Sequence, residues 1–486
     1  MTGFDVAGAA RAAGGRLEGL GRTASVRRVV IDSREVEEGD LFVALPGTRT
    51  DGHGFVAEAL RRGAVGALVG PEAPPLEGDL AGRSQIRVAD PRRALSELAA
   101  AHRRTLRCPV IAITGSNGKS STREMVARAL SPLGEIVQSQ KSYNNDLGVP
   151  LTVLRAGPAT AALVVEMGTS GPGEIARLCD VARPDVGVVT NVSAAHLEGL
   201  GTEEGVAHEK AALVRCLPPE GRAVLNGDDP RVAAMAGQTT APALRFSVGD
   251  PRAEVWGCEP RRTPRGVEFF LYGKMRIFLP VPGLHNVPNA LAAVAVGLLQ
   301  GIEPGALREA LRGVRLPSMR MQRIALGGRT LLLDCYNANP ASLHAAVEEL
   351  SARPARGRRV LVMGDMRELG PRSADLHYAA GRHAASRVDF LWCVGPESRH
   401  AYEAARDEGL EDDRLAWSPT VEDAAAVPAV RLARGDVALL KASRGMRLER
   451  LADVLRRGAA ERPELVGAAA GAAAGEDAAL DARRVG

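Results

Sequence analysis

Aromatic residues are scarce in this chain of 486 residues, with only three tryptophans, five tyrosines and eight phenylalanines. Single-stranded nucleic acids are bound largely by stacking of the bases on aromatic side chains, so this composition argues against such a partner. The charge does not indicate one either, because the formal net charge is +4 and the arginines are scattered along the chain. We therefore expect no nucleic acid among the partners.

Cysteines are also few, and long apolar runs are missing. The six cysteines lie far apart in the sequence, which excludes a CxxC pair for zinc or redox chemistry. In a chain of this length they are typical of reduced thiols in a cytosolic protein. No apolar run reaches the roughly 18 residues of a membrane-spanning helix, and the first residues lack the apolar segment of a signal peptide. We expect a cytoplasmic protein without membrane insertion.

What the chain does contain is a regular alternation of apolar β-rich runs with helical stretches. At about 150 residues per domain, its length predicts about three domains, and the alternation is typical of doubly wound α/β sheets. Helices are predicted over Pro91–Leu106, with Asp90 as N-cap, and over Pro340–Ser351. The predicted buried strands are Pro109–Thr114, Ala162–Met167, Val186–Thr190, Arg222–Leu225, Thr330–Asp334, Arg359–Gly364, Asp389–Gly395 and Asp436–Lys441.

One loop has the pattern of a phosphate-binding site. A GxxGKS sequence lies between the apolar strand and a helical stretch, Arg123–Leu130. Its backbone N–H groups would cradle phosphate oxygens, Lys119 would supply charge to the β- and γ-phosphates, and Ser120 would offer a hydroxyl to Mg²⁺. Ile113 replaces the first glycine of the longer P-loop pattern, and a chance turn is the alternative. The residues predicted to bind nucleotide are Gly115, Ser116, Asn117, Gly118, Lys119, Ser120 and Ser121.

Three further polar residues each allow two interpretations. Glu166 ends the strand Ala162–Met167, so it is either an acidic loop residue or a Mg²⁺ ligand, since hard cations take carboxylate oxygens. His196 follows another strand end, and a single histidine is usually structural. Lys210 stands in a helical stretch, where a lysine is usually a solvated charge. The residues alone leave these alternatives open.

The loop and six further segments resemble the Mur ligase family, ATP-dependent amide-forming enzymes of peptidoglycan synthesis. The resemblance covers about residues 28–455 and includes the short TGxxGK[ST] form of the loop. The DNPR signature of the diamino-acid-adding members is absent. Three segments resemble the N-terminal domain of the later members: Asp32–Arg34, Gly39–Phe42 and Asp51–His53. Three others resemble the members that add D-alanyl-D-alanine: Tyr143–Pro150, Asp334–Pro340 and Gly364–Gly370.

This resemblance implies an α/β fold with the three-domain Mur ligase architecture. An N-terminal domain over 1–106 would bind the UDP precursor. A central domain over 107–315 would carry a P-loop ATPase-type parallel sheet, and a Rossmann-like domain would follow over 316–465. The remaining residues, 466–486, are rich in glycine and alanine before becoming charged, and we expect a disordered tail.

The resemblance also implies roles for individual residues. Ser120, Glu166, His196 and a carbamylated Lys210 would hold two Mg²⁺ ions, and Lys119, His196 and Lys210 would be catalytic. Further residues expected at ATP are Asn286, Asn289, Arg320, Asp334, Tyr336 and Asn337. Those expected at the UDP precursor or the acceptor are Ser33, Arg34, Asp51, His53, Asn144, Asn145, Lys441, Ser443 and Arg444.

The reaction that the resemblance implies is ATP-dependent ligation of D-Ala-D-Ala to UDP-MurNAc-tripeptide through an acyl phosphate. The third residue of the tripeptide, diaminopimelate or lysine, stays open, and we expect a monomer. Two alternatives remain. The chain could be another ligase of the superfamily, such as a diamino-acid-adding Mur ligase or a folylpolyglutamate synthetase. It could also be a non-catalytic nucleotide-binding scaffold, although Lys119, Glu166 and His196 are all present.

Overall fold

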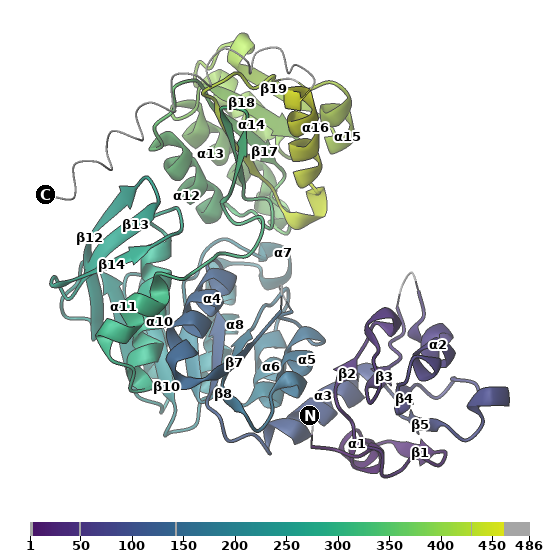
Figure 1. Ribbon diagram of the computed structural model, residues 1–486. Coiled ribbons are helices and arrows are strands. Elements are labelled where there is room, and N and C mark those ends of the chain that lie inside the picture. Colours follow the sequence, from purple (N-terminus) through teal and green to yellow (C-terminus); the bar gives the residue numbers. More distant parts are fainter. Residues whose placement is uncertain (1–2, 48–49, 141–142, 429, 461–486) are drawn as a thin grey trace, which may run out of the picture. The chain divides into compact units, whose positions relative to one another are not determined.

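The computed structural model describes residues 3–47, 50–140, 143–428 and 430–460 (Figure 1). Its contacts divide the chain into two units, Met1–Pro317 and Ser318–Gly486. The tail expected to be disordered, 466–486, lies outside the described residues. In the described part of the chain, no helix has both the length and the hydropathy that crossing a membrane requires.

The first unit begins with a small five-stranded sheet of order β1-β5-β4-β3-β2. Its strands run parallel except β1, which pairs antiparallel with β5 at one edge. The buried side chains of Phe42, Leu60 and Ala67 form its core with their neighbours. The elements are α1 (Val6–Ala12), β1 (Arg16–Glu18), β2 (Val29–Val30), β3 (Leu41–Val43), α2 (Val56–Arg61), β4 (Gly66–Val69), β5 (Ser84–Arg87) and α3 (Pro91–Arg103).

Helix α3 links this sheet to the larger one that follows. It begins at Pro91 because Asp90 caps it, as predicted, with its side chain accepting from the N–H groups of Arg92 and Arg93. It ends at Arg103, short of the predicted Leu106. The helix packs on α1, α5 and α6, and its last turn is tied to the central part of the unit. There Arg103 bonds the Ala182 carbonyl at 2.8 Å and the Asp185 carboxylate at 3.0 Å.

A nine-stranded sheet of order β14-β13-β12-β11-β10-β9-β6-β8-β7 forms the centre of this unit. The elements that alternate up to β11 are β6 (Val110–Thr114), α4 (Lys119–Leu130), β7 (Glu135–Gln138), α5 (Gly148–Arg155), β8 (Thr160–Glu166), α6 (Glu174–Ala182), β9 (Val186–Val189), α7 (Leu197–Leu200), α8 (Glu203–Arg215), β10 (Arg222–Asn226), α9 (Pro230–Ala233) and β11 (Ala243–Val248). They are followed by β12 (Val255–Thr263), β13 (Gly266–Leu271), β14 (Met275–Leu279), α10 (Asn286–Leu299) and α11 (Pro304–Leu311).

The predicted parallel strands of this sheet are confirmed, and one edge departs from the prediction. Strands β7 to β12 are parallel, whereas β12–β13 and β13–β14 pair antiparallel. In β13 (Gly266–Leu271) buried and partly exposed residues alternate, because one face meets the core and the other is more open to solvent. Helix α10, which is apolar nearly all round, packs against α4 in that core.

The second unit contains a six-stranded sheet of order β15-β16-β20-β17-β18-β19, parallel except for the β15–β16 pair. The two faces of the sheet pack in separate cores. In β20 (Val437–Lys441), Leu439 packs with the helices between Pro340 and Asp407, and Leu440 packs with the helices that follow Thr420. Helices therefore cover both faces, as in the predicted Rossmann-like arrangement. The elements are β15 (Gln322–Leu326), β16 (Arg329–Leu333), α12 (Pro340–Ser351), β17 (Arg359–Gly364), α13 (Ser373–Ala385), β18 (Phe390–Val394), α14 (Arg399–Asp407), β19 (Leu415–Ser418), α15 (Val421–Ala426), β20 (Val437–Lys441) and α16 (Glu449–Ala460).

Candidate active site

The predicted phosphate loop joins β6 to α4 at the carboxyl edge of the central sheet. Gly118 has φ 80°, and a Cβ there would lie 2.5 Å from Asn289 Oδ1, so a glycine is required. Lys119 opens the helix, and its Nζ donates to the carbonyls of Gly115 at 2.8 Å and Ser116 at 3.2 Å. The ammonium therefore lies against the loop. The other predicted hydroxyls, of Ser120 and Ser121, are buried in the first turn.

A second segment, directly after β9, holds the loop in shape. Thr190 Oγ1 donates to the Asn117 carbonyl at 2.6 Å, and the Asn117 N–H donates to Asn191 Oδ1 at 2.9 Å. Ser193 N–H donates to Ser116 Oγ at 3.0 Å. No local pattern singles out Thr190, Asn191 or Ser193, because their bonds to the loop span more than 70 residues of chain.

Glu166 is a buried residue beside this loop, and it is not an exposed loop residue. It ends β8, and its backbone is paired with that of Ile113, two residues before the loop begins. Asn144 Nδ2 donates to its Oε1 at 3.0 Å, and Arg123 Nη1 lies 3.4 Å from its Oε2. Its side chain is 1% exposed. Arg123, at 4% exposed, is a partner that the sequence did not reveal, since an arginine in a helix is usually solvated.

Lys210 is fully buried in α8, so the solvated-charge interpretation is wrong. Burial, together with the nearby charge of Lys119, lowers the pKa of Lys210 well below that of an ordinary lysine. The adjacent Glu209 is occupied elsewhere, because its carboxylate accepts from the N–H groups of Ile175 and Gly173, each at 2.7 Å. The lowered pKa favours the neutral form of this amine.

His196 and the two predicted asparagines surround the same edge of the sheet. His196 stands at the start of α7 with φ 57°, a left-handed conformation uncommon for residues other than glycine. Asn289 Oδ1 accepts from Thr122 Oγ1 in α4 at 3.1 Å, and Asn289 Nδ2 donates to Asn286 Oδ1 at 3.1 Å. Both asparagines are buried and tie the start of α10 to the phosphate-loop helix.

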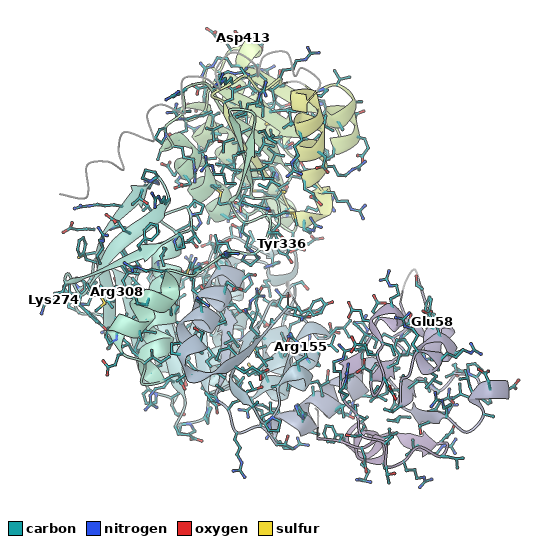
Figure 2. The ribbon with its side chains drawn as sticks, viewed as in Figure 1. Glu58, Arg155, Lys274, Arg308, Tyr336 and Asp413 are labelled. Carbon is teal, nitrogen blue, oxygen red and sulfur yellow. The ribbon has the colours of Figure 1, made fainter. Side chains whose placement is uncertain are left out.

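A cleft of about 880 Å³ lies within the first unit, lined by residues of and around the small sheet, by residues of α5 and by Gln140 and Tyr143 before that helix. Ser33 and Arg34, predicted to bind substrate, are among its lining residues. Arg155, which the sequence analysis did not single out, reaches it from the end of α5, as does Glu58 from α2 (Figure 2). Burial lowers the pKa of Arg155, whose Nη1 donates to the Gln138 carbonyl at 3.1 Å.

The other predicted substrate residues of the first unit have local structural contacts. His53 Nδ1 lies 2.6 Å from Asp51 Oδ1, and its Nε2 accepts from the Gly70 N–H at 2.8 Å. Neither Asp51 nor His53 is among the described residues that line the cleft. Asn145 Oδ1 accepts from the N–H of Gly148, the first residue of α5, at 3.0 Å. Substrate contacts by these residues stay predictions.

In the second unit, the predicted residues gather around Lys441. Its Nζ donates to Asp334 Oδ2 at 2.7 Å and to the Asn337 carbonyl at 3.0 Å, and its side chain is buried. Arg320 stacks on the ring of Tyr336, with 4.5 Å from the guanidinium carbon to the ring centroid.

The two remaining predicted residues lie just after β20. Ser443 Oγ accepts from the Arg367 N–H at 2.9 Å, and the Arg444 guanidinium pairs with Glu449 at 2.7 Å. Cys335, next to Asp334, is buried, as expected of a small residue at a strand end.

Comparison with known proteins identifies the family. Three Mur ligase models match the chain: the family's catalytic domain over 25–103, the middle domain over 113–297 and the glutamate ligase domain over 319–444. The UDP-N-acetylmuramoyl-tripeptide--D-alanyl-D-alanine ligase of Escherichia coli is 38% identical over 403 residues, covering 81% of this chain and 86% of that protein. The chain belongs to the Mur ligase family, in its MurF group.

Solved MurF structures share the whole architecture. A crystal structure of MurF from Acinetobacter baumannii superposes with a TM-score of 0.81 at 30% identity, covering 92% of this chain and 98% of that one. MurF from Thermotoga maritima, solved in complex with ADP, gives a TM-score of 0.77 at 28% identity, covering 90% and 99%. A folylpolyglutamate synthase of Mycobacterium tuberculosis, at 20% identity and a TM-score of 0.57, shares the fold alone. Of the alternatives left open by the sequence, the MurF group is therefore the one supported.

Proposed function

We propose that this chain ligates D-alanyl-D-alanine to UDP-MurNAc-tripeptide with cleavage of ATP to ADP and phosphate. It thereby makes the UDP-MurNAc-pentapeptide precursor of peptidoglycan. The observation that carries the proposal is the phosphate loop with Glu166 and Lys210 buried beside it, in a chain 38% identical to a ligase of this name. The cytoplasmic location and the monomeric state expected from the sequence stay predictions.

The reaction proceeds in two transfers. The tripeptide carboxylate attacks the γ-phosphorus of ATP, and ADP leaves from an acyl phosphate. The free amine of D-Ala-D-Ala then attacks the acyl carbon, so that an amide forms and phosphate leaves. Phosphoryl transfer needs positioning and neutralisation of charge more than covalent participation by the protein. Lys119 supplies such a charge at the loop, where backbone N–H groups at the start of α4 face a phosphate.

The donors on this sheet edge fit a hard divalent cation. The Glu166 carboxylate, the Ser120 hydroxyl and His196 follow three neighbouring strands, β8, β6 and β9, at their carboxyl ends. Buried carboxylate and hydroxyl oxygens are ligands that Mg²⁺ prefers. Mg²⁺ held by Ser120, Glu166, His196 and a carbamylated Lys210 would neutralise phosphate charge during the transfer.

The burial of the Lys210 amine supports a carbamate at this position. Carbamylation requires the neutral amine, which attacks CO₂ and releases a proton to leave an anionic carbamate. The lowered pKa of Lys210 favours that neutral form, and Glu209 is bound to backbone N–H groups. An ammonium at this position would repel Mg²⁺, whereas carbamate oxygens would bind it.

A phosphate-release assay on the full chain tests the function. With ATP, Mg²⁺ and UDP-MurNAc-tripeptide present, we expect turnover with D-Ala-D-Ala and little with diaminopimelate or glutamate, and mass spectrometry should show the pentapeptide product. Faster turnover with a single amino acid would contradict the proposed acceptor. The carbamate has its own test, because a short carboxylic acid should restore part of the activity to Lys210→Ala by filling the vacated space. A crystal structure with Mg²⁺ and nucleotide, showing a bare ammonium at Lys210, would exclude the carbamate.

A further inference from the structure

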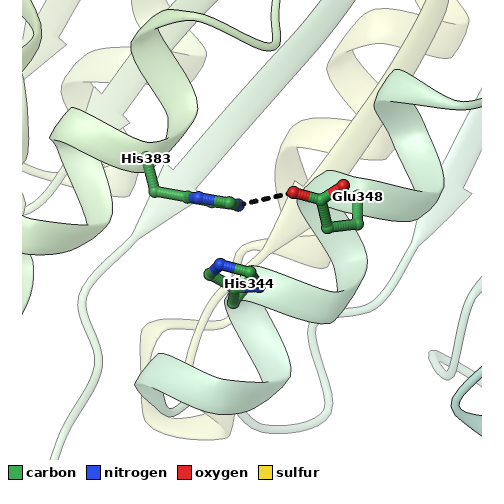
Figure 3. A group of neighbouring side chains, drawn as sticks. All are labelled: His344, Glu348 and His383. Carbon is green, nitrogen blue, oxygen red and sulfur yellow. Dashed lines mark ion pairs between the residues drawn. The ribbon is translucent and has the colours of Figure 1, made fainter.

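A second cluster of ligand-type side chains lies in the other unit, on helices that the proposed reaction does not use. His344 and Glu348 stand four residues apart on α12, which places them on one face of that helix. His383 meets them from the last turn of α13 (Figure 3). Among the residues that the structure describes, these three form the one group of at least three His, Cys, Asp or Glu whose ligand atoms all lie within 4.8 Å of one another.

The two imidazoles lie close together, with His383 half-buried and His344 exposed. Their rings stack, with centroids 3.6 Å apart and an angle of 22° between their planes. His383 Nε2 lies 3.3 Å from Glu348 Oε1, as the dashed line in Figure 3 shows. The geometry is too poor for a hydrogen bond, so this buried nitrogen has no hydrogen-bond partner within the described ranges. A buried ring nitrogen rarely lacks a hydrogen-bond partner, and one that lies 3.3 Å from a carboxylate oxygen requires an explanation.

An arginine that follows α13 holds the Glu348 carboxylate in place beside the two imidazoles. Arg387 Nε bonds Glu348 Oε1 at 2.7 Å, the same oxygen that faces His383. The carboxylate can therefore keep this guanidinium on one oxygen and offer the other to an ion.

We propose that His344, Glu348 and His383 bind one divalent transition-metal ion, of which Zn²⁺ is the best match. Two imidazole nitrogens with one carboxylate oxygen are a donor set typical of Zn²⁺, and water completes the coordination. Bound Zn²⁺ holds its ligand atoms about 3.3 Å apart, given Zn–N and Zn–O distances of about 2.0–2.1 Å. An imidazole binds a metal in the plane of its ring, so the two stacked rings would have to rotate about their side-chain bonds to share one ion. The ion would tie α12 to α13 and stabilise the second unit.

Titration of the full-length protein with Co²⁺ tests the site. The protein is first stripped with a chelator, and excess Mg²⁺ is then added to fill the oxygen-rich site of the first unit. Co²⁺ bound by nitrogen ligands at low coordination number gives visible absorption bands that are stronger than those of the hydrated ion. We expect the wild-type chain to bind one equivalent with such bands, and Zn²⁺ to displace it.

Two variants and a matched control decide the outcome. His344→Ala and His383→Ala should each weaken Co²⁺ binding about tenfold or more, because even residues that only orient a metal ligand contribute about 10- to 100-fold. His400→Ala removes a histidine that lies 3.8 Å from Glu403 on α14, outside the cluster, and should bind as the wild type does. Zn²⁺ should raise the melting temperature of the wild type and of His400→Ala, but not that of His383→Ala.

Several results would overturn the proposal. They are wild-type affinity in either cluster variant, no Co²⁺ bound by the wild type in excess Mg²⁺, or equal loss in His400→Ala. His344 is exposed, so its replacement should leave the fold intact even if His383→Ala fails to fold. After the protein has been stripped with a chelator and given Mg²⁺ alone, phosphate release with ATP and both substrates should be the same in all variants. This result would separate the cluster from the proposed reaction.

Discussion

Asn144 Nδ2 donates a hydrogen bond of 3.0 Å to Glu166 Oε1. This bond joins the YNNDLGVP segment, which resembles only the D-alanyl-D-alanine-adding ligases, to the carboxylate proposed to bind Mg²⁺. The other oxygen of Glu166 faces Arg123 Nη1 at 3.4 Å. The amide therefore orients the carboxylate from one side, while the guanidinium holds it from the other.

Asn144→Ala should leave a folded enzyme that needs more Mg²⁺. Without the amide, Glu166 keeps Arg123 as a partner and turns away from the orientation that a metal ion needs. Losing a group that orients a metal ligand typically costs about 10- to 100-fold in affinity or activity. The measurement is phosphate release against Mg²⁺ concentration. Gln238→Ala, which removes an exposed amide, should behave as the wild type does. An unchanged Mg²⁺ dependence in Asn144→Ala would show that the bond is only structural.

Elements with a local signal were predictable from the sequence, and the partners of the site were not. Asp90 before Pro91 predicted where α3 begins, and Pro340–Ser351 is the helix α12 that its pattern predicted. Continuous apolar runs, which are also a local signal, predicted the strands β6, β8 and β9. The burial of Lys210 depends on how α8 packs on the sheet, and that packing joins residues far apart in the sequence. The residue type and its helical stretch alone therefore predicted, wrongly, that Lys210 is exposed to solvent.

Lys119→Ala should abolish ligation while the fold survives. The Lys119 ammonium donates to two loop carbonyls, and neutral acceptors tolerate the loss of a donor better than a buried carboxylate does. Turnover should fall by about 10²- to 10³-fold or more, because the lost charge is worth most as the γ-phosphate is transferred. The matched control is Lys274→Ala, an exposed lysine in the turn between β13 and β14 (Figure 2). Wild-type turnover in a folded Lys119→Ala protein would refute the phosphate-loop assignment.

Lys210→Met should lose activity without losing stability. Burial lowers the pKa of Lys210 in the folded chain below the usual 10.5. At a pH between the folded and the unfolded pKa, the unfolded chain therefore binds a proton that the folded chain does not. Stability is then lost as the pH falls from 10.5 through the lowered folded pKa. Methionine has a similar length and no charge, so the substitution removes the loss of stability that the buried amine causes.

The comparison is made by thermal unfolding at pH 7 in CO₂-free buffer without metal. The melting temperature of Lys210→Met should equal or exceed that of the wild type, and phosphate release should be nearly absent. Arg231→Met, at a partly exposed arginine paired with Glu203 at 2.8 Å, is a control that removes a charge from the surface. A strongly lowered melting temperature with activity retained would show that Lys210 is a structural residue.

Arg155→Ala should weaken binding of the UDP precursor and leave the acceptor unaffected. The Arg155 side chain lines the 880 Å³ cleft together with Ser33 and Arg34, and it is exposed there with its guanidinium bonded to a backbone carbonyl. A cation in that state favours an anionic ligand such as a diphosphate. Losing one charge-assisted hydrogen bond of about 1.5–3 kcal/mol should raise KM for UDP-MurNAc-tripeptide by about 10- to 100-fold. KM for D-Ala-D-Ala and the melting temperature should change little.

Arg308→Ala is the control for this prediction, because it removes the charge of an arginine on α11 that is paired with Glu309 at 3.1 Å (Figure 2). It should leave both KM values unchanged. If Arg155→Ala raised KM for the dipeptide instead, the cleft would be the binding site of the acceptor and not of the UDP precursor.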